Sequence, residues 1–312
     1  MVNLKQSTKS EGIFMKRLLN CHASDFEKMS KEELKQAILA SEGRTVLSEN
    51  VVISQPLLGD LTNAETAAAF GADLILLNVL DVFNPVIQGL EQGLKDPIQT
   101  LKKIVGRPIG VNLEPVDVTA ETVGDLLQLP LGRRATKETL IKANELGFDF
   151  ICLTGNPSTG VSNQEIEAAI LLAKEHFDGL IIAGKMHGAG VAEPVVDQQS
   201  IENFIANGAD IILMPAVGTV PGLLESEVHE AVKLIKSKGA LSMTAIGTSQ
   251  ESSDPQTIRE FALSSKRAGV DIQHIGDAGY SGVADPENLM ALSIAIRGKR
   301  HTYYRMAQSI RR

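Results

Sequence analysis

Apolar and polar positions along the chain follow a repeating order, in which an amphipathic stretch with helical spacing leads into a short apolar run. One form of this pattern occurs four times, as GADLILL at 71–77, GFDFICL at 147–153, GADIILM at 208–214 and GVDIQHI at 269–275. The glycine fits the left-handed residue that ends a helix, the aspartate fits a short turn, and the apolar run fits a strand buried on both faces. The repeat therefore predicts four units in which a helix precedes a buried strand.

Four further apolar runs lie between these repeats, at 45–49, 108–112, 180–185 and 241–247. Helical stretches separate the strands, at 62–70, 97–105, 137–146, 163–176, 200–207, 226–237, 257–268 and 286–296. Strands that alternate with such helices pair in parallel through right-handed crossovers, and eight units close into a barrel. We predict an α/β protein with a (β/α)8 TIM barrel, whose bottom is covered by an extra helix at 30–41. An open doubly wound sheet is the alternative, although neither GxGxxG nor GxxxxGK[ST] occurs.

Composition narrows the class of protein. The chain has 312 residues, 43% of them hydrophobic, which is enough for one large barrel. We predict a single domain over 15–312 and a flexible polar tail over 1–14. The net charge of −8, without a basic block interleaved with aromatic residues, argues against nucleic acid as a partner. Neither a membrane-spanning stretch nor the apolar core of a signal peptide is visible, so we expect a cytoplasmic protein without a membrane partner.

Polar side chains gather at the carboxyl ends of the predicted strands. Because side chains alternate along a strand, one face of each strand points toward the barrel axis, and the active sites of such barrels lie at the carboxyl ends. The polar residues assigned to the inner face or to the mouth are Glu49, Asn78, Asn112, Glu114, Thr154, Lys185, His187, Thr244 and His274. A solvated strand end explains any one of them, whereas the whole set favours a functional pocket.

These residue types indicate general acid–base chemistry. Lys185 either clamps a carboxylate or phosphate or forms a Schiff base with a carbonyl carbon. His187 is a candidate for proton transfer, and His274 is either a second one or a core histidine. Glu49 and Glu114 are candidates for a base or for Mg²⁺ ligands. Four further residues are expected to bind substrate, namely Asn78, Asn112, Thr154 and Thr244.

Two loops rich in small residues follow the seventh and eighth strands, where barrels commonly bind phosphate. The residues expected to hold it are Gly247, Thr248, Ser249, Gly276, Gly279, Ser281 and Gly282. Plain turns are the alternative interpretation. Asp277 lies within the second loop, and its carboxylate is unfavourable beside a phosphate unless it points away or holds a metal ion.

Three segments, GADLILLNV, GADIILMPA and GKMHGAG, resemble the phosphoenolpyruvate mutase/isocitrate lyase barrels. The resemblance implies a small 2-oxo or enol acid as substrate, a Mg²⁺ cofactor, and a stabilised enolate in the making or breaking of C–C or P–C bonds. Asn78 and the Asn112/Glu114 strand end stand where that family has acidic metal ligands. The loops after the seventh and eighth strands are more similar to those of ribulose-phosphate-binding barrels.

The sequence therefore predicts a lyase or mutase-like enzyme that acts on a phosphorylated or phosphono small acid or sugar, with no organic cofactor and with Mg²⁺ as an option. The enzymatic alternative is a metal-independent sugar-phosphate isomerase, epimerase or Schiff-base aldolase. The non-enzymatic alternative is a regulatory barrel that binds a phosphorylated or carboxylate metabolite. The basic, aromatic segment 299–312 is a candidate contact in a homo-oligomer, or an ordinary surface helix.

Overall fold

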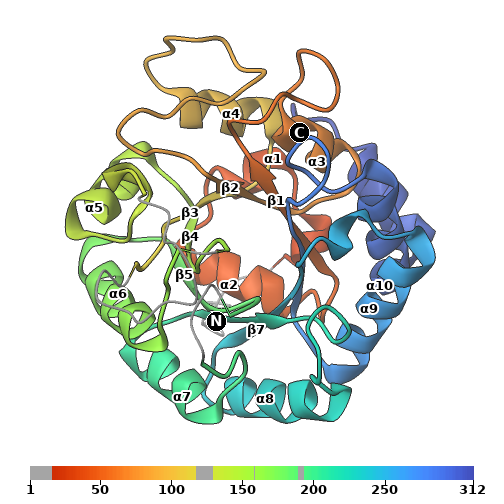
Figure 1. The fold of residues 1–312 in the computed structure, drawn as a ribbon. Helices are drawn as coiled ribbons and strands as arrows, with labels where there is room; N and C mark the ends of the chain where they lie inside the picture. Colours follow the sequence, from red (N-terminus) through yellow and green to blue (C-terminus); the bar gives the residue numbers. More distant parts are fainter. Residues whose placement is uncertain (1–15, 117–128, 158, 189–192) are drawn as a thin grey trace, which may run out of the picture.

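Eight parallel strands form a closed barrel in the computed structural model, which describes residues 16–116, 129–157, 159–188 and 193–312 (Figure 1). Each strand pairs with its neighbours in chain order, and β8 returns to pair with β1. The strands are β1 Thr45–Val51, β2 Leu74–Asn78, β3 Ile109–Asn112, β4 Phe150–Leu153, β5 Leu180–Gly184, β6 Ile211–Pro215, β7 Leu241–Ile246 and β8 Ile272–Ile275. The predicted (β/α)8 barrel is confirmed.

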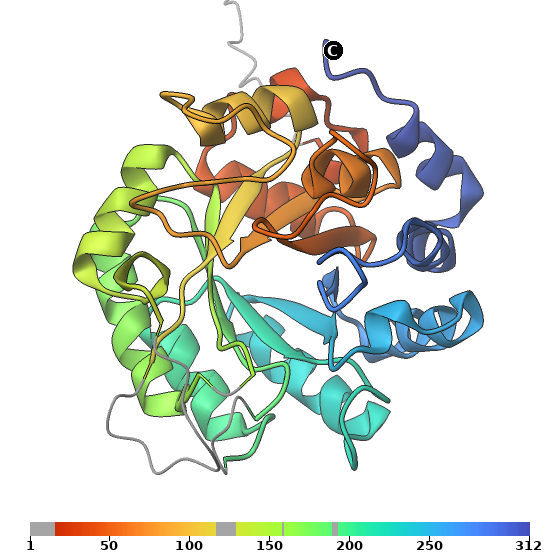
Figure 2. The same ribbon diagram turned by 45° about the horizontal axis from the view of Figure 1, so that its top comes forward.

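Helices surround the barrel and connect its strands (Figure 2). They are α3 Asn63–Ala69, α4 Pro97–Val105, α5 Lys137–Leu146, α6 Asn163–His176, α7 Gln198–Asn207, α8 Glu225–Ser237, α9 Pro255–Ala268 and α10 Pro286–Met306. The short helix α1 Ala23–Phe26 and the longer α2 Lys31–Leu39 precede β1. Leu34, Ala37 and Ile38 of α2 pack into the apolar cluster inside the barrel, so this helix covers the bottom as predicted. The predicted tail at 1–14 lies outside the described residues.

The basic carboxyl-terminal segment takes part in the fold. Helix α10 changes direction at Gly298, where φ is 74°, and continues along the barrel bottom. Arg305 is 1% exposed, and its Nε lies 2.8 Å from Asp73 Oδ1. Tyr303 and Tyr304 remain partly exposed, so an oligomer contact at this segment stays a prediction.

The four-fold repeat has a physical basis at the amino-terminal ends of the strands. Gly147 and Gly269 end α5 and α9 at φ values of 77° and 91°, in the left-handed region where glycine carries no steric cost. The repeat aspartates accept backbone N–H groups from the preceding strand, in the pairs Asp73–Val46 (2.8 Å), Asp149–Ile109 (2.7 Å), Asp210–Ile181 (3.1 Å) and Asp271–Ser242 (3.0 Å). Each aspartate also forms an ion pair: Asp73 with Arg297, Asp149 with Lys102, Asp210 with both Lys31 and Lys35, and Asp271 with Lys236. The repeat therefore ties neighbouring strands together below the barrel.

The barrel interior is apolar below and polar above. One cluster of buried side chains fills the inside, including Leu47, Phe150, Ile182 and Met243, while a larger cluster lies between the strands and the outer helices. Phe150 reaches across to β3, where a Cβ added at Gly110 would lie 2.2 Å from its ring. Above this packed layer the inner side chains become polar, which places the site at the carboxyl ends of the strands.

Candidate active site

A cavity of about 310 Å³ lies at the carboxyl ends of the strands. Seven of the residues proposed from the sequence line it, namely Glu49, Asn78, Asn112, Thr154, His187, Thr248 and Ser249. Three further polar residues contribute to its wall: Asn156 from the loop after β4, Glu251 from the loop after β7, and Asp277 from the loop after β8. The structure therefore brings most of the predicted strand-end residues together and adds three groups.

Three asparagine side chains form a connected network along one wall. The Asn78 side-chain N–H groups donate to Asn156 Oδ1 and to Asp277 Oδ2, both at 2.8 Å. Asn112 and Asn156 in turn donate to Asn78 Oδ1, each at 3.1 Å. Glu114 supports the network from behind, since it accepts from Asn156 at 2.8 Å and pairs with Arg133 at 2.8 Å. This network fixes the orientation of Asp277 at the cavity.

The carboxyl groups of the cavity hold their protons to unusually high pH. Burial raises the pKa of Glu49 to about 8, and the neighbouring Glu251 and Glu114 carboxylates add to the effect. Burial likewise raises the pKa of Asp277 to about 7, helped by Glu49 and opposed by the hydrogen bond from Asn78. The pKa of Glu251 is also raised by burial. Groups with such pKa values exchange protons near neutral pH, as general acids and bases must.

His274 lies directly behind Glu49. Its Nε2 is 3.0 Å from Glu49 Oε2, although the angle is outside the range of a hydrogen bond. Burial lowers the pKa of His274 to about 4, so the imidazole is neutral at pH 7. A neutral imidazole beside a protonated carboxyl group can pass or hold a proton without burying a net charge. Burial also lowers the pKa of His187, which lines the cavity from the loop after β5.

Several buried polar atoms at the cavity have no hydrogen-bond partner within the described part of the chain. They are Asn112 Oδ1, Thr154 Oγ1 and Glu251 Oε2. Buried polar atoms are normally paired, because an unpaired one costs about 1 to 3 kcal/mol. These atoms therefore mark positions at which a polar ligand would gain hydrogen bonds.

The backbone is strained at the same place. Val79, Thr248 and Ser249 have φ values of 61°, 57° and 65°, in the left-handed region that disfavours side chains, and branched ones most. Val79 follows directly after the cavity residue Asn78, and the other two line the cavity. Strain of this kind, about 1 to 3 kcal/mol per residue, is concentrated at functional sites.

Two residues predicted to face the barrel axis face outward. Ile182 and Met186 point inward, so Lys185 lies on the opposite face, where its Nζ is 2.5 Å from Glu193 Oε2. Glu193 also accepts the N–H of Asn163 at 2.9 Å, so the ion pair joins the loop after β5 to the start of α6. In β7, Met243 and Ala245 point inward, and Thr244 donates to Ser265 of α9 at 3.0 Å. The predicted inward positions of Lys185 and Thr244 were wrong.

The predicted phosphate loops are partly filled by the chain's own contacts. Thr248 and Ser249 line the cavity, and Gly247 lies against Met186. A Cβ added at Gly276 would lie 2.2 Å from Glu251 Oε1, so a carboxyl group already fills this turn. Farther along, the Ser281 carbonyl accepts from Asn63 at 2.6 Å, and the Gly282 carbonyl accepts from Val51 at 2.8 Å.

Gly279 forms the turn of the second loop, since a Cβ there would lie 1.8 Å from the Val283 carbonyl. Gly279, Ser281 and Gly282 are thus occupied in packing the loop after β8 on itself and on the loop after β1. The contacts of Ser281 and Gly282 with Asn63 and Val51 use their carbonyl oxygens, so phosphate binding through the N–H groups of this loop stays a prediction.

The tentative metal pair does not fit Mg²⁺. Both Glu114 oxygens are used, one by Arg133 and the other by the backbone N–H of Asn156 at 2.8 Å. Glu49 has a pKa raised to about 8 by burial, so a metal ion would first have to displace its proton. Over residues 16–312, apart from the gaps given above, no group of three His, Cys, Asp or Glu side chains is arranged to hold a metal ion.

Fold and cavity define this chain as a (β/α)8 barrel protein with buried carboxyl groups of perturbed pKa at the mouth. By sequence the chain belongs to the family described as Domain of unknown function (DUF7916), whose profile matches residues 19–312. No curated protein matches the sequence. Within the described residues, every helix is too short or too polar to cross a membrane.

Solved structures share the barrel at low sequence identity. An archaeal fructose 1,6-bisphosphate aldolase has a TM-score of 0.52 and 12% identity, over 84% of this chain and 98% of that chain. Oxaloacetate acetylhydrolase has a TM-score of 0.48 and 12% identity, over 80% and 81%. The phosphoenolpyruvate mutase/isocitrate lyase superfamily member 2,3-dimethylmalate lyase has a TM-score of 0.48 and 9% identity, over 78% and 80%. The aldolase similarity shows the fold alone.

Proposed function

We propose that the protein is an enzyme of the lyase or isomerase type, in which Glu49 and Asp277 move a proton at a small polar substrate. One observation carries the proposal: two buried carboxyl groups, with pKa values of about 8 and about 7, line the same cavity of about 310 Å³. Near neutral pH one of the two carboxyl groups can retain its proton while the other has lost its own. An acid and a base are then present side by side at neutral pH.

The surrounding residues support these roles. The hydrogen bond from Asn78 holds the Asp277 carboxylate in place, and the neutral imidazole of His274 lies next to the Glu49 carboxyl group. Asn112 Oδ1 and Thr154 Oγ1 have no partner in the described chain and are suited to orient polar groups of the substrate. The cavity size suits a small head group rather than a large cofactor.

Charge distinguishes between the possible substrates. Glu49, Glu251 and Asp277 line the cavity, while Lys185 and Arg133 are held in ion pairs with Glu193 and Glu114. A phosphate dianion beside three carboxyl groups is unfavourable, so a neutral hydroxyl, carbonyl or amide group fits better than the phosphorylated or phosphono group expected from the loops. A Schiff base on Lys185 has little support, because its ammonium group is paired outside the barrel.

Solvent proton exchange tests this proposal without knowledge of the full reaction. The protein is incubated in D₂O with 2-oxo and 2-hydroxy acids, their amides, sugar phosphates, phosphoenolpyruvate and phosphonopyruvate, and loss of the C–H signals is followed by ¹H NMR. We expect exchange in one or more of the compounds without phosphate, with a rate that rises through pH 7 and falls above pH 8. Glu49→Gln and Asp277→Asn should each abolish exchange, whereas Asp60→Asn, at an exposed loop position, should not.

The same panel identifies the competing functions. If only phosphorylated compounds exchange a proton, the substrate class expected from the sequence is right. If a chelator then abolishes this exchange, the enzyme depends on a metal ion. If compounds raise the melting temperature but none exchanges a proton, the barrel binds metabolites without catalysis, and the proposed enzyme is wrong.

A further inference from the structure

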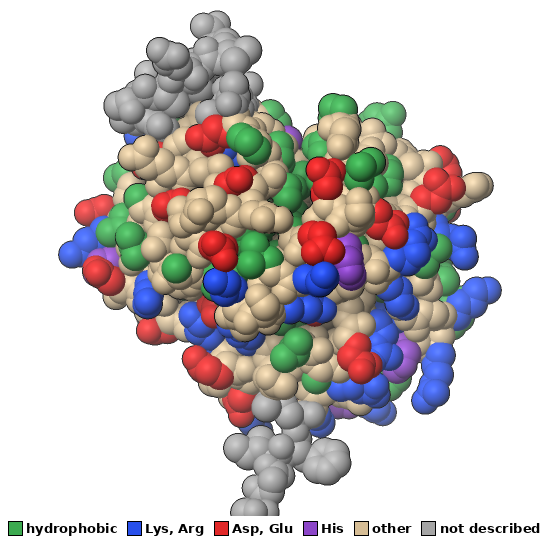
Figure 3. Space-filling model, turned by 90° about the horizontal axis from the view of Figure 1, so that it is seen from below, with side chains coloured by type: hydrophobic (Ala, Val, Ile, Leu, Met, Phe, Trp, Pro, Cys, Tyr) green, Lys and Arg blue, Asp and Glu red, His purple; other side chains and the backbone are tan. Residues whose placement is uncertain are grey.

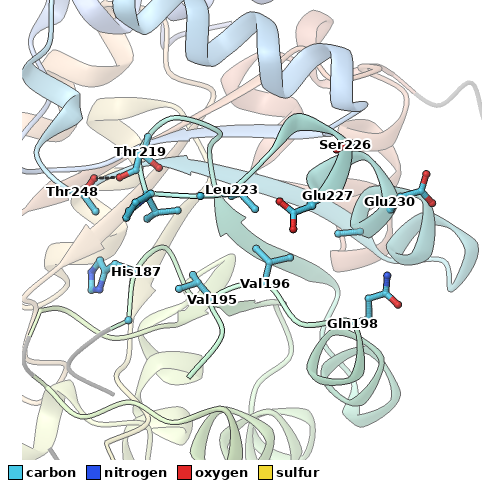
Figure 4. Close-up of a pocket in the computed structure, with 15 residues that line it drawn as sticks. His187, Val195, Val196, Gln198, Thr219, Leu223, Ser226, Glu227, Glu230 and Thr248 are labelled. Atoms are coloured by element: carbon cyan, nitrogen blue, oxygen red, sulfur yellow. Dashed lines mark hydrogen bonds between the residues drawn. The ribbon is translucent and has the colours of Figure 1, made fainter. Parts of the chain in front are cut away.

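A second and larger cavity adjoins the polar one. Its volume is about 870 Å³, and it lies between residues 187–188 and 195–198 of the loop after β5 and residues 219–223 of the loop from β6 to α8. His187 and Thr248 line both cavities, so they form the boundary between them. In Figure 4 these two residues lie at one end of the cavity, and Gln198 and Glu230 lie at the other.

The wall of this cavity is mainly apolar. Val195, Val196, Val220 and Leu223 contribute side chains from both loops. Thr219 and Thr248 also line the cavity, but their hydroxyl groups donate to backbone carbonyls, Thr219 to Ala216 at 2.7 Å and Thr248 to Thr219 at 2.6 Å (Figure 4). These two hydroxyl groups are thus satisfied within the chain, which leaves the part of the wall around them with little demand for polar partners on a ligand.

The carboxylates that line this cavity also have partners within the chain. Glu227 accepts the N–H of Leu224 at 2.8 Å, which caps α8, and Glu230 pairs with Lys233 at 3.2 Å. Seen from the side of α7 and α8, the surface is hollowed into a notch with hydrophobic side chains along its edge (Figure 3). A large apolar hollow that meets a small polar cavity is complementary to a molecule with one polar and one apolar end.

We propose that the natural substrate is amphiphilic, with a small polar head in the cavity of Glu49 and Asp277 and an apolar tail that passes between His187 and Thr248 into the larger cavity. This inference rests on the function proposed above, because it takes the polar cavity as the reaction site. The occupant is the hydrocarbon part of the substrate. A segment of another protein in the larger cavity is the competing interpretation, and the experiment below separates the two.

Binding of a homologous series tests the tail subsite directly. Calorimetry is performed with 2-hydroxyalkanamides of three to ten carbon atoms, whose neutral head suits the polar cavity. Burying one methylene group strengthens binding about three- to fourfold, so affinity should rise by this factor with each added carbon until the cavity is filled. Val220→Trp, which places a bulky ring in the wall of the cavity, should reduce this rise.

Two further variants test whether added bulk elsewhere, or misfolding of Val220→Trp, could explain the result. Val86→Trp places the same bulk at a partly exposed loop valine away from the cavity and should keep the full dependence on chain length. Val195→Asp places a charge in the cavity without bulk and should also reduce the rise, which covers the case that Val220→Trp does not fold. Melting temperatures and circular dichroism confirm that each variant is folded.

The outcomes separate this inference from the proposed function. If the three-carbon amide binds, Asp277→Asn weakens it, and added carbons change nothing, the tail subsite is refuted while the acid–base site stands. A rise with chain length that is unchanged in both cavity variants likewise refutes it. If long amides bind with the expected rise but Asp277→Asn has no effect, the head does not enter the polar cavity, and both the amphiphilic substrate and the proposed reaction site are wrong.

Discussion

Replacing Glu49 by glutamine should stabilise the protein at alkaline pH, because the native chain keeps this carboxyl group in a place that disfavours its charge. Glu49 is 2% exposed, and its pKa rises from 4.5 to about 8. Between these two values the folded state binds a proton that the unfolded state has released. The free energy of unfolding therefore falls as the pH rises through this interval, by about 1.4 kcal/mol for each pH unit contributed by this one group.

The expected change in the free energy of unfolding follows from the distance between the two pKa values of Glu49. The stabilising contribution of protonated Glu49 is fully present below pH 4.5 and is lost by about pH 8, which amounts to about 5 kcal/mol. Glutamine has a similar shape and never ionises, so the variant avoids this loss. His274 acts in the opposite direction between its lowered pKa of about 4 and the ordinary 6.5, since there the unfolded state binds the extra proton. Because both proteins contain His274, the difference between them reports mainly on Glu49.

Urea unfolding at half-unit steps from pH 4.5 to pH 8.5 measures this difference. The two free energies of unfolding should agree near pH 4.5 and diverge as the pH rises, with Glu49→Gln the more stable by several kcal/mol at pH 8. Glu91→Gln, at an exposed position, provides the control and should give a curve parallel to the wild type. A constant difference between Glu49→Gln and wild type across the whole range would refute the raised pKa and remove the basis of the proposed acid.

Three further predictions concern residues around the site. Lys185→Met should lower the free energy of unfolding by about 1 to 3 kcal/mol through loss of the Glu193 ion pair, and borohydride with carbonyl compounds should leave no adduct on Lys185 by mass spectrometry; an adduct would revive the aldolase. Asp271→Asn should cost about 1 to 3 kcal/mol in urea unfolding through the weakened hydrogen bonds to Ser242, with ligand affinity unchanged; weakened binding would contradict a purely structural role. Gly110→Ala should cost a similar amount, about 1 to 3 kcal/mol, by forcing a methyl group into the Phe150 ring; unchanged thermal unfolding would contradict the close contact.

The fold was predictable because the repeated sequence marks where each helix ends and where the next strand begins. Each glycine ends a helix and each aspartate accepts the N–H of the preceding strand, so the four repeats set both the boundaries and the inner face of the even-numbered strands. Asn78 in β2 and Thr154 after β4 were therefore placed at the mouth, where the structure has them lining the cavity.

The inner face of two odd-numbered strands could not be derived in this way. Strand β5 has the sequence LIIAG, which is apolar or small throughout, and β7 has LSMTAI, in which small polar and apolar residues alternate without a charged group. Both faces of a parallel strand are buried, so hydrophobicity carries no information about which face points inward. Lys185 was consequently assigned to the wrong face, although its position at the end of the strand was right.

Three cavity residues had no signal strong enough to be selected from the sequence. Asn156, Glu251 and Asp277 lie in loops, whose path depends on contacts with other loops rather than on periodicity. Asp277 was visible as a carboxylate in a presumed phosphate loop, and this conflict was the available clue. In the structure Asp277 lines the cavity and Glu251 packs against Gly276, so carboxyl groups lie where the sequence suggested a phosphate.

Stability and function are separated between the two ends of this barrel. At the amino-terminal ends of the strands, every repeat aspartate accepts a backbone N–H and forms an ion pair, which ties neighbouring elements together. At the carboxyl ends, buried carboxyl groups have raised pKa values, and Asn112 Oδ1, Thr154 Oγ1 and Glu251 Oε2 are among the buried polar atoms without partners in the described chain. Val79, Thr248 and Ser249 also adopt strained φ angles there. Each of these features costs free energy, and a barrel selected for stability alone would replace them with apolar side chains. Their concentration around one cavity is what the acid–base reaction proposed above would require.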